Sequence, residues 1–217
     1  MSEKPKNATK EKYTFKCFLH DFIFVTGAIP ALLLFRPKWV YQNEEKKRVK
    51  GGAIFIGNHS GFFDPIYMMI AVFYRRQRFL TMKEMFNTKF KCWLFDLFFC
   101  IPVDRQNFRL GTFREVVGRL KKEQAITMFP EGHISGEELA SFKSGMVLMA
   151  MTADKPIVPV YVKPRAHWYN RLVTVVGEPI HIREKYGDVK LNQMDEIAAD
   201  IQNIEKTLQQ YVEKKRR

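Results

Sequence analysis

The sequence is poor in cysteine, and it contains no internal repeat or low-complexity tract. Its three cysteines, Cys17, Cys92 and Cys100, have neither a metal-binding nor a redox spacing, and their odd number argues against a disulfide framework. No small-residue cleavage site follows an apolar core near the start of the sequence, as a secretory signal would require. We therefore expect a chain that faces the cytosol and needs no bound metal or other cofactor.

Acidic residues are also scarce relative to basic ones. The 217-residue chain has 36 lysines and arginines against 23 aspartates and glutamates, which gives a formal net charge of +13. This balance favours anionic partners, and three classes fit: nucleic acid, an anionic membrane surface, or a phosphate-rich substrate such as coenzyme A. The length predicts one domain, alone or with a small appendage.

The N-terminal part combines a lysine-rich tail with an apolar run over residues 22–35. Gly27 and Pro30 interrupt this run, which predicts two helices that meet at a bend. The run is short for a membrane span, while its basic flanks and nearby aromatic residues are typical of an anchor at headgroup level. We predict a membrane-associated segment over residues 1–43 and a main domain over residues 44–217. An internal core helix and a true span are the alternatives for the apolar run.

One short stretch combines strand and helix signals with a histidine and an aspartate. Residues 53–56 are an apolar run with β-branched and aromatic side chains, and they are predicted to form a buried strand. Asp64 and Pro65 then open a run with helical apolar spacing, because aspartate is a preferred N-cap and proline fits the first helical position. His59 is therefore expected in a strand-to-helix turn, where α/β proteins commonly place their chemistry.

His59 and Asp64 can cooperate if the turn folds the carboxylate back toward the imidazole. A carboxylate on one ring nitrogen fixes the tautomer, and the other ring nitrogen can then take a proton. The pair would act as a general base and its orienting residue, with no serine or cysteine nucleophile. The spacing by itself is weak evidence, because Asp64 could be only a helix cap and His59 an ordinary turn residue.

This stretch and four later blocks resemble the glycerolipid acyltransferase family, of the lysophosphatidate (1-acylglycerol-3-phosphate) acyltransferase type. The first block is Asn58-His59-Ser60-Gly61-Phe62-Phe63-Asp64-Pro65, similar to the family's motif of histidine, four residues and aspartate. The later blocks, in the family's order, are Ile101-Pro102-Val103-Asp104-Arg105, Phe129-Pro130-Glu131-Gly132, Phe142-Lys143-Ser144-Gly145 and Ile157-Val158-Pro159-Val160. The resemblance extends from about Lys50 to Ile180.

The resemblance implies a role for residues in several of these blocks. His59 is expected to be the general base, and Asp64 is expected to orient it. Later blocks are expected to bind the acceptor's phosphate and the rest of the substrate, which singles out Arg105, Glu131, Gly132, Lys83 and Lys143. Arg105 suits phosphate because a planar guanidinium offers paired donors, although a local pairing with Asp104 is an alternative.

The sequence departs from the family's pattern at two positions. The lysine that is proposed to stabilise the oxyanion in relatives is replaced by Met82, and Lys83 is its neighbour. The arginine that closes the third block in relatives is replaced by Ile134, and His133 could substitute for it only in part. These departures concern the oxyanion donor and the identity of the acceptor more than the reaction type.

The rest of the chain alternates between strand and helix patterns. Further strands are predicted over residues 79–81, 103–105 (leading into a loop), 125–129, 157–162 and 172–176, and helices over residues 108–122, 141–153 and, as an amphipathic C-terminal helix, 194–211. The aromatic residues 90–100 are predicted to be core, with an acyl channel as the alternative, and Arg75, Arg76 and Arg78 either to be solvated or to contact lipid or coenzyme. The pattern predicts an α/β fold with a central, largely parallel sheet flanked by helices and an N-terminal apolar membrane anchor. The resemblance implies a glycerol-3-phosphate acyltransferase-like fold.

The expected function is acyl transfer from acyl-CoA or acyl-carrier protein to the hydroxyl of a lysophospholipid, with lysophosphatidate as the first choice. The chain would act at the cytoplasmic face of an anionic membrane, as a peripheral or monotopic protein. Four alternatives remain: another lysolipid acceptor, a non-catalytic lipid-binding relative, a thioesterase-like hydrolase in which His59 activates water, and a nucleic-acid-binding protein. The last lacks a basic-aromatic motif.

Overall fold

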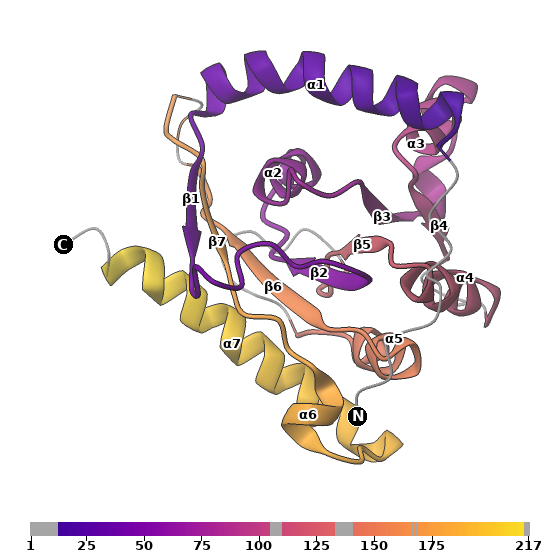
Figure 1. Cartoon of the computed structure of the whole chain (residues 1–217), viewed down its shortest axis with the longest axis vertical. Coiled ribbons are helices and arrows are strands. Elements are labelled where there is room, and N and C mark those ends of the chain that lie inside the picture. Colours follow the sequence, from indigo (N-terminus) through magenta and orange to yellow (C-terminus); the bar gives the residue numbers. More distant parts are fainter. Residues whose placement is uncertain (1–12, 105–109, 133–140, 166, 168, 215–217) are drawn as a thin grey trace.

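The computed structural model describes residues 13–104, 110–132, 141–165, 167 and 169–214. These residues form a seven-stranded sheet, in the order β1-β7-β6-β2-β5-β3-β4, with helices on both faces (Figure 1). Neighbouring strands are parallel except for the antiparallel pair β6 and β7. The predicted α/β fold with a largely parallel central sheet is therefore confirmed.

The strands lie close to where the alternation of apolar residues predicts them. They are β1 (Lys38–Tyr41), β2 (Ala53–Gly57), β3 (Gln77–Met82), β4 (Ile101–Val103), β5 (Ala125–Met128), β6 (Ile157–Val162) and β7 (Val173–Val176). Strand β1 was not predicted. It is an edge strand that pairs with β7, so the sheet begins before the boundary expected at residue 44.

The helices are α1 (Phe15–Phe35), α2 (Asp64–Ala71), α3 (Lys89–Leu97), α4 (Leu110–Lys121), α5 (Gly145–Ala153), α6 (Ile182–Tyr186) and α7 (Met194–Lys214), with short 3-10 turns η1 (Lys83–Met85) and η2 (Leu191–Gln193). Helix α6 and both turns were not predicted. Helix α5 begins later than expected, with Ser144 at its N-cap. Lys143 therefore precedes the helix, and its predicted place in the first helical turn is wrong.

Strand β2 lies at the centre of the core, and each of its residues is buried. Successive side chains of a strand point to opposite faces. Ile54 and Ile56 pack with buried residues of α4, α5 and α7, whereas Phe55 packs with α2 on the other face. A strand that is covered on both faces reads as a continuous apolar run, which explains why the sequence predicts it so clearly.

Helix α1 corrects the prediction of two N-terminal helices. It is a single helix of 21 residues that passes through both Gly27 and Pro30. Proline removes one helical hydrogen bond and its ring crowds the carbonyl one turn earlier, but the exposed Pro30 does not end the helix here. The helix begins before the apolar run over residues 22–35, and by length and composition it could cross a membrane. The prediction that the apolar segment is too short to cross a membrane is therefore wrong.

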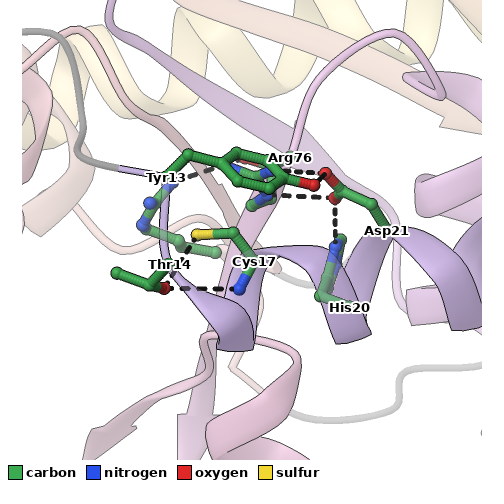
Figure 2. Close-up of polar contacts among 7 residues, drawn as sticks. Tyr13, Thr14, Cys17, His20, Asp21 and Arg76 are labelled. Carbon is green, nitrogen blue, oxygen red and sulfur yellow. Dashed lines mark hydrogen bonds and ion pairs between the residues drawn. The ribbon is translucent and has the colours of Figure 1, made fainter.

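Polar contacts join the N-terminal half of α1 to the sheet (Figure 2). The Asp21 carboxylate accepts hydrogen bonds from Arg76 Nη2 at 2.6 Å, from Arg76 Nε at 3.2 Å and from the Tyr13 hydroxyl at 3.1 Å. His20 is buried beside them, with Nδ1 2.9 Å from Asp21 Oδ1. Arg76 precedes β3, so these contacts fix α1 across one face of the sheet, as Figure 1 shows.

The three arginines near β3 are half-buried or buried and make contacts within the chain. Arg76 pairs with Asp21 in α1. Arg75 donates hydrogen bonds to the backbone oxygens of Val49, Gly51 and Glu123. Arg78 is 1% exposed, with its guanidinium over the Phe99 ring. These residues hold loops and α1 in place, so the prediction of a solvated cluster is wrong.

Helix α3 also differs from its prediction as a core element. Phe90 is 66% exposed and Trp93 is 51% exposed, and Leu97 is the buried residue of the helix. Lys16 of α1 pairs with Asp96 of α3, so the two helices lie together at one end of the molecule (Figure 1). Composition cannot distinguish an aromatic helix inside a core from one that turns its rings outward.

Candidate functional site

The site lies where β2 and β5 end. These strands are parallel neighbours, so their carboxyl ends meet at the same edge of the sheet. His59 follows β2, and Glu131 follows β5. The fold thereby joins two sequence blocks that are far apart along the chain, at the edge where open α/β sheets bind their ligands.

The His59 turn folds the Asp64 carboxylate back onto the imidazole. Nδ1 of His59 lies 2.9 Å from Oδ2 of Asp64, and the backbone N–H of Gly61 donates to the same oxygen at 2.7 Å. The Asp64 side chain is 2% exposed, whereas that of His59 is 17% exposed. Solvent and substrate can thus reach the imidazole, while the carboxylate behind it is shielded.

The predicted role of Asp64 as the helix N-cap is wrong. Phe63 occupies the N-cap position of α2 without a side-chain hydrogen bond, and Asp64 is the first helical residue. Its carboxylate is instead occupied by the turn that precedes the helix. The sequence signal that suggested a cap came from the Asp-Pro pair, which also suits the first turn of a helix.

The Glu131 block supports the His59 turn from the neighbouring strand. Oε1 of Glu131 accepts the backbone N–H of His59 at 3.1 Å, and Glu131 is 2% exposed. The ring of Phe129 stacks on the imidazole, with centroids 4.4 Å apart and an angle of 18° between the planes. Glu131 was expected among the substrate contacts, and in the structure its carboxylate accepts the backbone N–H of His59.

Gly132 and Lys143 lie together next to this support. The backbone of Gly132 has φ of 77°, a left-handed conformation that favours glycine. A side chain there would also meet Lys143, whose Cε and Nζ lie 3.2 Å from the position of a Cβ. The N–H of Lys143 donates to the oxygen of Pro130 at 3.2 Å, which holds the two blocks side by side.

The remaining predicted substrate contacts are less closely tied to His59. Lys83 is exposed and follows β3, so it lies at the same sheet edge, beyond β5. Arg105, His133 and Ile134 fall outside the described residues, and their predicted roles stay predictions. Among the residues that are described, no group of three or more histidine, cysteine or acidic side chains could hold a metal ion.

Sequence analysis missed Glu205, which lies on α7 behind the site. It is fully buried, and its carboxyl oxygens make no hydrogen bond of normal length with the part of the chain that the structure describes. Burial raises the pKa of Glu205 well above its ordinary value of 4.5, and the nearby Glu131 carboxylate raises it further; the backbone N–H of Asn58 opposes part of this rise. One signal was available: Glu205 interrupts an apolar stripe that includes Ile201 and Leu208.

The geometry of the pair suits general base catalysis. An ionised carboxylate can only accept, so this contact suits the tautomer of His59 with the proton on Nδ1 and the lone pair on Nε2. In this arrangement the shielded Asp64 carboxylate would stabilise an imidazolium formed when Nε2 takes a proton. The arrangement can deprotonate a hydroxyl or a water molecule that is brought to the exposed side of the ring.

The chain is similar to known acyltransferases. The family model described as Acyltransferase matches residues 38–163. The 1-acyl-sn-glycerol-3-phosphate acyltransferase of Bacillus subtilis is 24% identical over 163 residues, which cover 73% of this chain and 81% of that protein. The enzyme of the same name from Escherichia coli is 33% identical over 166 residues, which cover 71% of this chain and 65% of that protein.

A solved structure supports the fold. The crystal structure of the 1-acyl-sn-glycerophosphate acyltransferase PlsC from Thermotoga maritima superposes with a TM-score of 0.65 at 17% identity, and covers 90% of this chain and 80% of that one. The family match itself extends from β1 to the end of β6, which is more than half of the chain and includes the His59 turn. This chain therefore belongs to the acyltransferase family.

Proposed function

We propose that the chain transfers a fatty acyl group from an acyl thioester to the hydroxyl of lysophosphatidate, which gives phosphatidate. The observation that carries the proposal is the buried Asp64 carboxylate 2.9 Å from the partly exposed imidazole of His59. The names of the relatives from Bacillus subtilis and Escherichia coli support this choice of acceptor. Acyl-CoA and acyl-carrier protein are both suitable donors.

In the proposed reaction, Nε2 of His59 takes the proton of the acceptor hydroxyl as its oxygen attacks the thioester carbonyl carbon. The carbon–sulfur bond of the resulting tetrahedral intermediate then breaks, and the thiolate leaves with the proton from the imidazolium. A positioned base is worth about 100- to 10,000-fold in rate. The two substrates must be held together for the rest, and oxyanion donors contribute as well.

In this proposal, cationic side chains near the sheet edge bind the phosphate of the acceptor. Lys143, exposed and lying over Gly132, is one candidate, and Lys83 is another. Arg105 follows β4 and is assigned to the acceptor's phosphate by the family resemblance. Ile134 leaves one family cation missing, so these residues would have to share the charge of the acceptor.

We also propose that α1 binds the membrane in which the lipid substrates reside. Large apolar residues recur on its outer side at helical spacing, and each is more than half exposed: Phe15, Phe18, Phe22, Val25, Ile29 and Leu33. Exposed apolar patches of this kind mark membrane or protein interfaces. The net charge of +13 favours an anionic, cytoplasmic surface, on which the protein would lie peripherally or monotopically.

The decisive experiment offers the purified protein labelled acyl-CoA or acyl-carrier protein and a panel of lysolipids, with products identified by mass spectrometry. His59→Ala should lower turnover by about 100-fold or more and leave the free energy of unfolding within about 1 kcal/mol, because the side chain is partly exposed. Unchanged turnover in this variant would refute the proposed base.

The same panel separates the alternatives. Better use of a lysolipid without a phosphate monoester would show that the acceptor differs, as Ile134 allows. Release of fatty acid without an acceptor would indicate a hydrolase. Vesicle binding without turnover would indicate a lipid-binding relative. Tight, salt-sensitive binding of DNA or RNA would instead support the nucleic-acid alternative.

A further inference from the structure

Arg165 lies at the same sheet edge as His59, on the side away from Glu131. Strands β2 and β6 are parallel neighbours, and Arg165 follows β6. The side chain of Asn58 donates to the oxygen of Val162 at 2.9 Å and accepts the N–H of Val162 at 2.8 Å. The residue before His59 is thus tied to the end of β6, shortly before Arg165.

The guanidinium of Arg165 is packed between aromatic rings but is poorly hydrogen bonded. Its carbon lies 4.9 Å from the centre of the Phe35 ring and 6.0 Å from that of Tyr67. Nη1 makes one long hydrogen bond of 3.5 Å to the Tyr67 hydroxyl, while Nε and Nη2 are buried and make none with the described residues. A guanidinium is always charged, so two buried donors without acceptors are costly to leave unmet.

Three more basic residues, Arg36, Lys163 and Arg171, form a cationic rim with Arg165. Lys163 precedes Arg165 by two residues, Arg36 follows Phe35, whose ring lies against the Arg165 guanidinium, and Arg171 donates to Arg36. Nη2 of Arg36 donates to the oxygen of Tyr169 at 2.5 Å, and Nε of Arg171 donates to the oxygen of Arg36 at 3.0 Å. Backbone oxygens are thus the acceptors of these two cations. Among the described residues, no acidic side chain forms an ion pair with Arg165.

The rim lies where the apolar helix α1 ends. Phe35 is the last residue of α1, its ring packs edge-on against Tyr67 at 5.4 Å, and its oxygen accepts the N–H of Leu172 at 2.8 Å. Figure 1 shows this end of α1 beside the start of β1 and the β6–β7 connection. If the outer side of α1 lies among acyl chains, its end lies at the level of the lipid phosphates.

We propose that Arg165 is a phosphate-binding residue that holds the headgroup of a membrane lipid at the edge of the site, through its buried Nε and Nη2. The planar fork of a guanidinium matches two phosphate oxygens, which would satisfy both donors at once. The lipid is either the acceptor substrate or a neighbouring anionic lipid of the bilayer. A water-soluble acyl donor is not expected to bind here, because the site lies at the end of an apolar helix that is proposed to contact the membrane.

Two measurements on Arg165→Gln test this inference, and Arg119→Gln is the matched control. Arg119 pairs with Glu115 on α4, so the control removes the same charge elsewhere. The first measurement is cosedimentation with phosphatidylcholine vesicles, with and without phosphatidic acid, which requires no turnover. The second is the KM of lysophosphatidate and of acyl-CoA, which rests on the proposed function. Thermal unfolding shows whether the variants fold. If Arg165→Gln does not fold, Arg165→Lys replaces it in both measurements.

Arg165→Gln should either bind phosphatidic acid vesicles about tenfold or more weakly or have a KM for lysophosphatidate about tenfold or more higher, as expected for the loss of a charge-assisted hydrogen bond. The change should be smaller for Arg165→Lys. A rise in the KM of lysophosphatidate identifies the acceptor as the lipid. Weaker binding to phosphatidic acid vesicles with both KM values unchanged identifies a bilayer lipid. The proposal is overturned if Arg165→Gln matches Arg119→Gln in both measurements, or if the KM of acyl-CoA alone rises. A wild-type protein without turnover would refute the proposed function, and the vesicle measurement would still decide the role of Arg165.

Discussion

The Nδ1 atom of His59 and the Oδ2 atom of Asp64 lie 2.9 Å apart within a turn that needs no helix cap. Phe63 occupies the N-cap position of α2 with no side-chain bond, so the carboxylate is left to serve the imidazole and the N–H of Gly61. Met68 of α2 packs against Gly57 so closely that a Cβ there would lie 2.7 Å from its sulfur. The close contact between helix and strand end fixes the geometry of the pair.

Asp64→Asn separates the orienting role from a merely local one. An amide oxygen can still accept from the His59 ring or the Gly61 N–H, so the turn should keep its shape. The negative charge that stabilises the imidazolium is lost, and the amide can select the wrong tautomer. We expect kcat to fall by about 100-fold or more while thermal unfolding changes little. Steady-state kinetics and a melting curve measure both.

Ser60→Ala is the matched control for this variant. The Ser60 hydroxyl lies 3.5 Å from the other oxygen of Asp64, a contact too long to contribute much. Its removal leaves the pair with His59 intact, so kcat should stay near that of the wild type. If Asp64→Asn is as active as Ser60→Ala, Asp64 only shapes the turn.

The attachment of α1 gives a prediction about stability. Asp21 and Arg76 pair through two hydrogen bonds, with side chains 39% and 21% exposed. Solvent screens a partly exposed ion pair and so limits its contribution to the free energy of unfolding. A double-mutant cycle with Asp21→Asn and Arg76→Gln should therefore give a coupling energy of about 0.5–1 kcal/mol. Urea unfolding in mild detergent measures it. The exposed pair of Glu115 and Arg119 within α4 serves as comparison, at about 0.3–0.5 kcal/mol. A coupling of zero would mean that the contact in Figure 2 does not hold α1.

The sequence predicts the central strands and the His59 turn because their signals are local. Residues 53–56 are apolar on both faces, and Gly57 and Pro65 mark where the strand ends and the helix starts. The closeness of His59 to Asp64 follows from the turn between them. The contact between His59 and Glu131 depends on which strands are neighbours, and the alternation of strands and helices does not specify the strand order. Only the family resemblance, which assigns both residues to one site, indicated that they lie close together.

Prediction fails where the environment of a segment decides its structure. Phe90 and Trp93 look like core residues but are exposed, because α3 turns them away from the sheet. Gly27 and Pro30 look like a break, yet α1 continues through both of them, because each residue weakens a helix without necessarily ending it. Arg76 looks like a solvated residue at the end of α2, and its partner Asp21 lies in a different segment of the chain.

Glu205 is fully buried, whereas Asp195, Glu196 and Asp200 of the same helix are partly or fully exposed. It lies near Glu131, whose carboxylate holds the backbone of His59, so α7 reaches the site from behind the sheet. The raised pKa of Glu205 means that the folded protein holds this proton more tightly than the unfolded chain does. Folding stability should therefore depend on pH through this residue.

The sign of this dependence follows from proton linkage. At a pH below 4.5, the ordinary pKa of the carboxyl, both states are protonated and Glu205 has no effect. As pH rises above that value, the unfolded chain loses the proton while the folded protein keeps it. The free energy of unfolding then falls by about 1.4 kcal/mol per pH unit until the folded carboxyl also ionises. Glu205→Gln, a neutral side chain of the same shape, should lack this loss.

We therefore expect Glu205→Gln to gain stability over the wild type as pH increases from about 4 to about 8, with the two proteins most alike at the acid end. Urea unfolding at several pH values measures the difference. Glu196→Gln is the control, because it makes the same substitution at an exposed position of the same helix. If the curve of Glu205→Gln is parallel to that of the wild type, the Glu205 carboxyl ionises as readily in the folded protein as in the unfolded chain, and it cannot lie buried beside Glu131.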